Sequence, residues 1–173
     1  LNIANEAGDG DVTTQQWVNT YTTAVQRLRN ASIRVPIVID APDFGKNLTV
    51  IIQGANQLLA VDPNLIFSFH PYWPQNGGAT PTFIEDNFEA ARQVGMALVL
   101  GELSEWGAFN GNGSICQGNG KVDYTTMVTK AAAKGFGLYA WEWGPGNEFG
   151  GADCKKMDMT TNGNLNTLKA GWA

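Results

Sequence analysis

The chain has 173 residues, a length typical of a single domain with a sizeable core. Its formal net charge of −5, with 11 Lys and Arg against 16 Asp and Glu, argues against a nucleic-acid partner, because phosphates require a basic face. No apolar stretch reaches the roughly 18 residues of a membrane-spanning helix, so we expect no membrane partner. A single histidine, His70, excludes most metal sites and nucleophiles that need several histidines. What remains is an acidic, Gly- and Trp-rich domain suited to carboxylate chemistry on a neutral ligand.

Short apolar runs alternate with longer amphipathic stretches along the chain. The apolar runs predict five strands, at residues 1–5, 35–40, 65–70, 97–102 and 136–143. The amphipathic stretches predict helices at residues 13–30, 47–60, 81–95 and 123–134, with a last helix at 165–172. Strands that alternate with helices indicate a parallel sheet with right-handed crossovers. We therefore expect one α/β domain over residues 1–173.

Polar and aromatic residues cluster where the predicted strands end. In chain order they are Asn5 and Glu6, Asp40, His70 and Tyr72, Glu102, and Trp141 with Glu142. The carboxyl ends of parallel strands meet at one edge of the sheet, and this edge builds the active site of α/β enzymes. Five consecutive strands with such residues predict a functional site there.

Two of these residues, Glu6 and Glu102, form a candidate catalytic pair. Two convergent carboxyl groups are the minimal apparatus for cleaving a glycosidic bond, and they stand about 5–5.5 Å apart in retaining enzymes. Repulsion and burial raise the pKa of the acid, so that it holds its proton near neutral pH. The alternative is that each Glu is a solvated strand end or an ion-pair partner. Glu105 follows in a loop, and we interpret it as lying outside the reacting centre.

Four of the six tryptophans lie at or just after strand ends, namely Trp73, Trp106, Trp141 and Trp143. Indole rings offer flat apolar faces on which sugar rings can pack, and aromatic side chains of this kind also fill cores. Both interpretations stay open, and we favour a sugar platform for Trp141. Trp17 and Trp172 sit on helix patterns and are expected in the core.

The chain has two cysteines, Cys116 and Cys154, both in Gly/Asn-rich loops. Two thiolates are too few for a four-ligand metal site. A pair of loop cysteines favours one disulfide and hence a secreted protein.

The motifs at the strand ends, taken together, resemble glycoside hydrolase family five. They match that family's strands four, six, seven and eight in order, and the match covers essentially the whole chain; the motifs are Asn5-Glu6, His70-Pro71-Tyr72, Gly101-Glu102 and Ala140-Trp141-Glu142-Trp143. Residues 38–45 resemble the fifth-strand region of bacterial β-mannanases in the same family. The family folds as a TIM barrel, so the resemblance implies a partial barrel of five βα units that begins at strand four.

The resemblance also implies a role for each site residue. Glu6 would be the acid/base and Glu102 the nucleophile of a retaining mechanism, which needs no metal or organic cofactor. Asn5 would bind the sugar 2-hydroxyl, His70 and Tyr72 would orient the carboxylates, and Trp141 would carry the sugar ring, with Trp73 and Trp143 as further substrate-binding residues. Because the family's neighbouring Arg and His belong to strands outside this chain, we expect the pKa of Glu102 to be raised.

These expectations together predict retaining endo-hydrolysis of a β-1,4-linked polysaccharide, mannan or cellulose. The alternative is a carbohydrate-binding barrel fragment that does not turn over. Both edges of a half-barrel sheet lack partners, so we also expect a homodimer through the open barrel edges.

Overall fold

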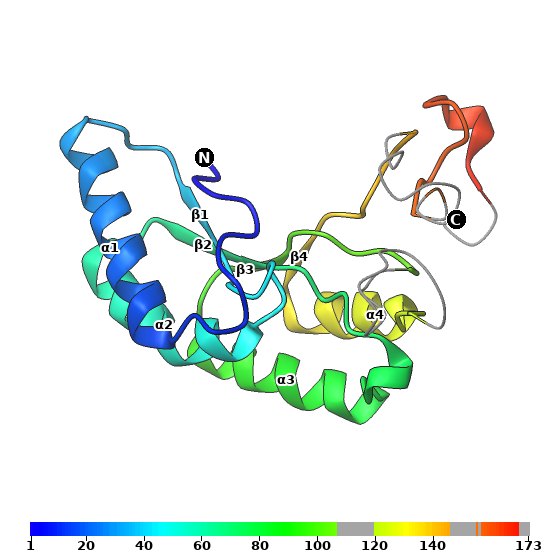
Figure 1. Ribbon diagram of the computed structural model, residues 1–173, viewed down its shortest axis with the longest axis horizontal. Coiled ribbons are helices and arrows are strands. Elements are labelled where there is room, and N and C mark those ends of the chain that lie inside the picture. Colours follow the sequence, from blue (N-terminus) through cyan, green and yellow to red (C-terminus); the bar gives the residue numbers. More distant parts are fainter. Residues whose placement is uncertain (107–119, 146–154, 156, 170–173) are drawn as a thin grey trace.

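The protein is an α/β structure built on one parallel sheet (Figure 1). The computed structural model describes residues 1–106, 120–145, 155 and 157–169. The strands β1 (Ile37–Asp40), β2 (Leu65–Phe69), β3 (Leu98–Leu100) and β4 (Gly137–Leu138) pair in chain order, all parallel. This arrangement confirms the predicted class of a partial barrel with parallel strands and outer helices.

Four helices lie along one side of this sheet (Figure 1). They are α1 (Thr14–Asn30), α2 (Leu48–Val61), α3 (Pro81–Val94) and α4 (Tyr124–Lys134). Two short 3-10 turns, η1 (Gln75–Gly77) and η3 (Leu165–Thr167), complete the described elements. The four longer predicted helices are thus confirmed within one or two residues.

Side-chain caps fix where the helices begin. Thr13 and Gln16 form a reciprocal capping box at the start of α1, and Thr80 caps α3 with Pro81 in its first turn. Gly95 ends α3 in the left-handed conformation that glycine adopts at little cost. These local signals explain why the helix boundaries follow from the sequence.

The hydrophobic core lies between the helices and the sheet. It is made of the apolar faces of α1 to α4 and the outward side chains of β1 to β3, with Ile37, Ile39, Phe67, Phe69 and Leu100 fully buried. Trp17 of α1 is 2% exposed and belongs to this core, as its helical position predicts. No described helix is long and apolar enough to cross a membrane.

The prediction of a regular strand at residues 1–5 is wrong. Residues 1–5 make one parallel bridge, between Asn2 and Val38, and the Leu1 carbonyl accepts from the Val38 N–H at 2.8 Å. The chain then turns, because the Asn2 side chain accepts from the Ala4 N–H. The sheet consequently has four strands among the described residues, not five.

Two elements near the C-terminus are shorter than predicted. The strand predicted at residues 136–143 is reduced to Gly137–Leu138. The helix predicted at 165–172 is a 3-10 turn at its start, since Leu168 instead bridges antiparallel to Thr160. Cys116, Cys154 and Trp172 lie outside the described residues, so the predicted disulfide remains a prediction.

The side of the sheet away from the helices borders a cavity of about 700 Å³. Inward residues of successive strands line it, among them Val38, Ile66 and Val99, and His70 lies at its carboxyl end. This concave side corresponds to the interior of the partial barrel, and its carboxyl end holds the predicted site.

Candidate active site

The segment that precedes α1 carries Asn5 and Glu6 to the carboxyl end of β1. Glu6 has a φ of 53°, the left-handed region that costs a side-chain-bearing residue about 1–2 kcal/mol. Its backbone N–H donates to the Oδ2 of Asp40, the last residue of β1, at 3.1 Å. The Glu6 side chain is about one-third exposed and faces the neighbouring strand ends.

His70, the residue directly after β2, stands at the centre of the site and is 2% exposed. Two glycines pack against its ring. A Cβ added to Gly45 would lie 2.6 Å from Nδ1, and one added to Gly101 would lie 2.9 Å from Nε2. Both positions therefore need glycine so that the imidazole can lie between the β1 loop and the end of β3.

Three carboxyl groups surround the His70 ring. Nδ1 is 2.9 Å from Glu6 Oε1 and 3.6 Å from Glu102 Oε1, and Nε2 is 3.7 Å from Asp40 Oδ2. Burial opposes protonation of the imidazole, but the hydrogen bond to Glu6 and the charges of Glu102 and Asp40 together raise its pKa above the usual range. His70 thus links the three carboxyl groups, and these neighbours favour its protonated form.

Glu102 follows β3 and is 8% exposed. Its Oε2 accepts from the Tyr72 hydroxyl at 2.8 Å, and the Asn5 side chain donates a second hydrogen bond. Burial is the largest effect on this carboxyl and raises its pKa, with repulsion from Glu6 in the same direction; His70, Tyr72 and Asn5 counteract. The expected rise in the pKa of Glu102 is therefore present, and burial is its main cause.

Burial and the Glu102 charge raise the pKa of Tyr72, which keeps its hydroxyl a donor.

The two predicted catalytic carboxylates converge. One oxygen of Glu6, one oxygen of Glu102 and a ring nitrogen of His70 all lie within 4.8 Å of one another. One oxygen of each carboxylate thus lies within 4.8 Å of the other, and the two groups differ in setting: Glu102 is buried and held by two donors, and Glu6 is more accessible.

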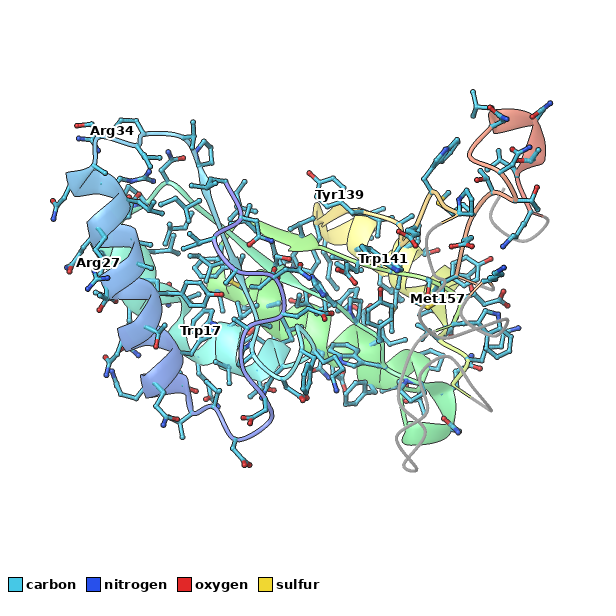
Figure 2. The ribbon with its side chains drawn as sticks, turned by 45° about the horizontal axis from the view of Figure 1, so that its top comes forward. Trp17, Arg27, Arg34, Tyr139, Trp141 and Met157 are labelled. Atoms are coloured by element: carbon cyan, nitrogen blue, oxygen red, sulfur yellow. The ribbon has the colours of Figure 1, made fainter. Side chains whose placement is uncertain are left out.

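The predicted aromatic residues divide into two groups. Trp141, Tyr72 and Trp106 all pack against the buried Met157, so Trp141 shares a cluster with the site residue Tyr72. Figure 2 shows Trp141 and Met157 close together, across the sheet from α1.

Trp73 and Trp143, the two other predicted substrate-binding tryptophans, lie in different settings. The Trp73 ring packs against Phe69, Phe83 and Phe88, and its Nε1 donates to the Lys46 carbonyl. The Trp73 ring is partly buried by these contacts and also lines a pocket with Tyr72, so its role in substrate binding stays a prediction. Trp143 is 43% exposed, and its Nε1 donates to the Gly163 carbonyl, so the C-terminal segment holds it.

Two further glutamates lie near the strand ends. Glu105 forms an ion pair with Lys121 at 2.8 Å, in line with its interpretation as a residue outside the reacting centre. Glu142 is held by backbone hydrogen bonds to Met157 and Met159, and burial together with the charge of Asp158 raises its pKa.

The sequence interpretation gave no role in the site to Asp40, Gly45 or Gly101. Asp40 carried a signal, since it ends an apolar strand as the other site residues do. Gly101 directly precedes Glu102, but its need for glycine comes from the distant Ser68 and His70. Only the folded arrangement places these residues around the imidazole.

The fold and this site define a partial (β/α) barrel with a pair of carboxylates at the carboxyl ends of its strands. The cellulase domain of glycosyl hydrolase family 5 matches residues 1–147. The chain belongs to glycosyl hydrolase family 5, as its motifs predict.

Known relatives are consistent with this family. The mannan endo-1,4-beta-mannosidase of Cellvibrio japonicus is 30% identical over 97% of this chain and 36% of its own length. The beta-mannanase/endoglucanase A of Caldicellulosiruptor saccharolyticus is 28% identical over 94% of this chain and 11% of its own. The solved beta-mannanase of Thermomonospora fusca matches with a TM-score of 0.78 and 28% identity, over 98% of this chain and 52% of that chain. The chain thus spans about half the length of that solved structure and about a third of the Cellvibrio protein.

Proposed function

We propose that this chain carries out retaining hydrolysis of a β-1,4-linked glycan, with mannan as the preferred polymer. The observation that supports it most is the convergence of Glu6 and Glu102, with oxygens within 4.8 Å, in environments that differ in burial. The names of the relatives, mannan endo-1,4-beta-mannosidases and a beta-mannanase/endoglucanase, favour mannan over cellulose.

The proposed reaction has two steps. In the first, an oxygen of Glu102 attacks the anomeric carbon while Glu6 gives its proton to the leaving glycosidic oxygen, so that a glycosyl ester forms and the C–O bond to the leaving sugar breaks. In the second, Glu6 takes a proton from water, and the water oxygen displaces Glu102 from the anomeric carbon. Asn5 and Tyr72, which donate to Glu102, hold the nucleophile in place, and Trp141 supports the sugar ring.

The proposal is tested by reducing-sugar release from mannan and from carboxymethyl-cellulose. We expect release from mannan that falls on the order of 10⁴-fold in Glu102→Gln, because the amide keeps the shape but not the nucleophile. Glu105→Gln is the matched control and should stay near the parent rate, since Glu105 pairs with Lys121. Equal activity of Glu102→Gln and the parent would contradict the proposal.

Glu6→Gln separates the acid from the nucleophile. It should slow polymeric mannan far more than aryl mannosides with good leaving groups, which need little protonation. Equal losses on both substrates would contradict the assignment of Glu6. Mannan binding without turnover in the parent chain would instead support the binding-fragment alternative.

We further propose that a second copy of the chain covers the open side of the sheet. The cavity there has apolar inward residues, and the outer edge carries Leu138 and Tyr139, which are 40% and 66% exposed. Sedimentation equilibrium at micromolar concentration should give twice the mass of one chain, and a single species with the mass of one chain would contradict the dimer.

A further inference from the structure

Asp40 is a buried carboxylate next to the reacting groups to which the two-step reaction assigns no part. It is the last residue of β1 and is 0% exposed. Its carbonyl accepts from the Trp17 indole N–H at 2.8 Å, and its backbone is paired in register with Ser68 of β2. Asp40 is therefore held firmly by both α1 and β2.

The Asp40 side chain is directed at the two groups that control proton transfer. Oδ2 accepts from the Glu6 backbone N–H at 3.1 Å and lies 3.7 Å from His70 Nε2. Oδ1 is buried and accepts no hydrogen bond among the described residues. A buried carboxylate costs free energy unless it is satisfied, so its contacts through Oδ2 are the ones that hold it there.

The backbone of Glu6 needs such support. With a φ of 53°, Glu6 adopts a left-handed conformation that side-chain-bearing residues avoid. From this conformation its side chain reaches His70 Nδ1 at 2.9 Å. A strained residue persists only where its surroundings fix it, and the hydrogen bond to Asp40 Oδ2 comes from the neighbouring strand.

We propose that Asp40 is a positioning residue of this site: its carboxylate holds the Glu6 backbone in the left-handed conformation and, on the opposite side of the His70 ring, stabilises the protonated imidazole. The second effect follows from charge. The titratable groups that face His70 are Glu6, Asp40, Glu102 and the Tyr72 ring, and Asp40 is the one next to Nε2. The inference about Glu6 rests on its proposed role as acid/base, and the effect on His70 does not.

The test compares Asp40→Asn with Asp62→Asn. The amide side chain of Asp40→Asn keeps the shape and an oxygen acceptor but loses the charge. Asp62 is a matched control, because it is also a buried carboxylate that accepts a backbone N–H, from Asn64, and it lies in an ion pair with Arg29. Since His70 is the only histidine, its imidazole resonances can be titrated by NMR without ambiguity.

We expect the pKa of His70 to fall in Asp40→Asn and to stay at the parent value in Asp62→Asn. On mannan, kcat of Asp40→Asn should fall about 10-fold or more with KM little changed, and aryl mannosides with good leaving groups should lose less, because positioning of a general acid is impaired. An unchanged His70 titration together with a parent kcat would overturn the proposal, whatever the variant's stability.

A second measurement needs no variant. In the parent protein the Glu6 amide hydrogen should exchange at least about 10-fold more slowly than an unprotected amide, because it donates to a buried oxygen. Exchange at the unprotected rate would overturn the proposal even if Asp40→Asn failed to fold. A parent chain that did not hydrolyse glycans would refute the proposed function, but the titration and the exchange rate would still decide whether Asp40 acts on His70 and Glu6.

Discussion

Replacing Tyr72 by phenylalanine removes one hydroxyl group and almost no volume. That hydroxyl donates to Glu102 Oε2 at 2.8 Å in a partly buried setting. A hydrogen bond to a charged group contributes about 1.5–3 kcal/mol, and one pKa unit corresponds to about 1.4 kcal/mol. Because the bond favours the ionised carboxylate, its loss should raise the already raised pKa of Glu102 by about one to two units.

The assay is the pH dependence of kcat/KM on mannan. Glu102 must be ionised to attack, so the acidic limb of the profile should move to higher pH by about one to two units in Tyr72→Phe. Tyr139→Phe is the matched control, since Tyr139 is 66% exposed and lies after β4 on the same sheet. If the acidic limb stayed in place in Tyr72→Phe, the argument that Tyr72 holds Glu102 in its ionised form would be refuted.

Three further predictions concern the scaffold. Gly101→Ala should lower the free energy of unfolding, measured in urea, by about 1–3 kcal/mol, because the new Cβ would collide with Ser68 and His70. Stability equal to that of the parent would contradict this packing. Asp62→Asn should lower the free energy of unfolding by about 1–2 kcal/mol near pH 7 and by almost nothing near pH 2. The reason is that Arg29 lowers the pKa of Asp62, so this stabilisation is lost as the pH falls through that pKa. A loss of stability that did not depend on pH would argue against the ion pair. Cys116 and Cys154 should resist alkylation without reductant, and a mass gain of two adducts in the native protein would disprove the disulfide.

The helices were predictable because their signals are local. The capping box of Thr13 and Gln16 and the Thr80–Pro81 start both lie within four residues of the helix that they begin. The order of strands was also predictable, since each short apolar run is followed by a helical period. The grouping of Glu6, His70 and Glu102 then followed from the rule that parallel strands meet at their carboxyl ends.

The errors arose where distant contacts decide the local structure. Residues 1–5 look like a strand, but the Asn2 side chain caps a turn and leaves one bridge to β1. Residues 165–172 have a helical pattern, but Leu168 pairs with Thr160 instead.

The role of Asp40 could not be predicted for a related reason. The sequence places Asp40 at a strand end. It gives no signal for the left-handed backbone of Glu6, whose N–H meets the Asp40 side chain only in the folded chain. The need for glycine at positions 45 and 101 could not be predicted either, because in both cases it comes from the His70 ring, which follows another strand.

The most direct test of the central claim, that Glu102 is the nucleophile of a retaining hydrolysis, is to trap the covalent intermediate. A 2-deoxy-2-fluoro mannoside with a good leaving group should form a slowly hydrolysed ester, and peptide mass spectrometry should find the adduct on Glu102. The Glu102→Gln variant should gain no mass under the same conditions, and Glu105→Gln should be labelled like the parent. A label on Glu105, or mannan hydrolysis that retains configuration without any label on Glu102, would contradict the account.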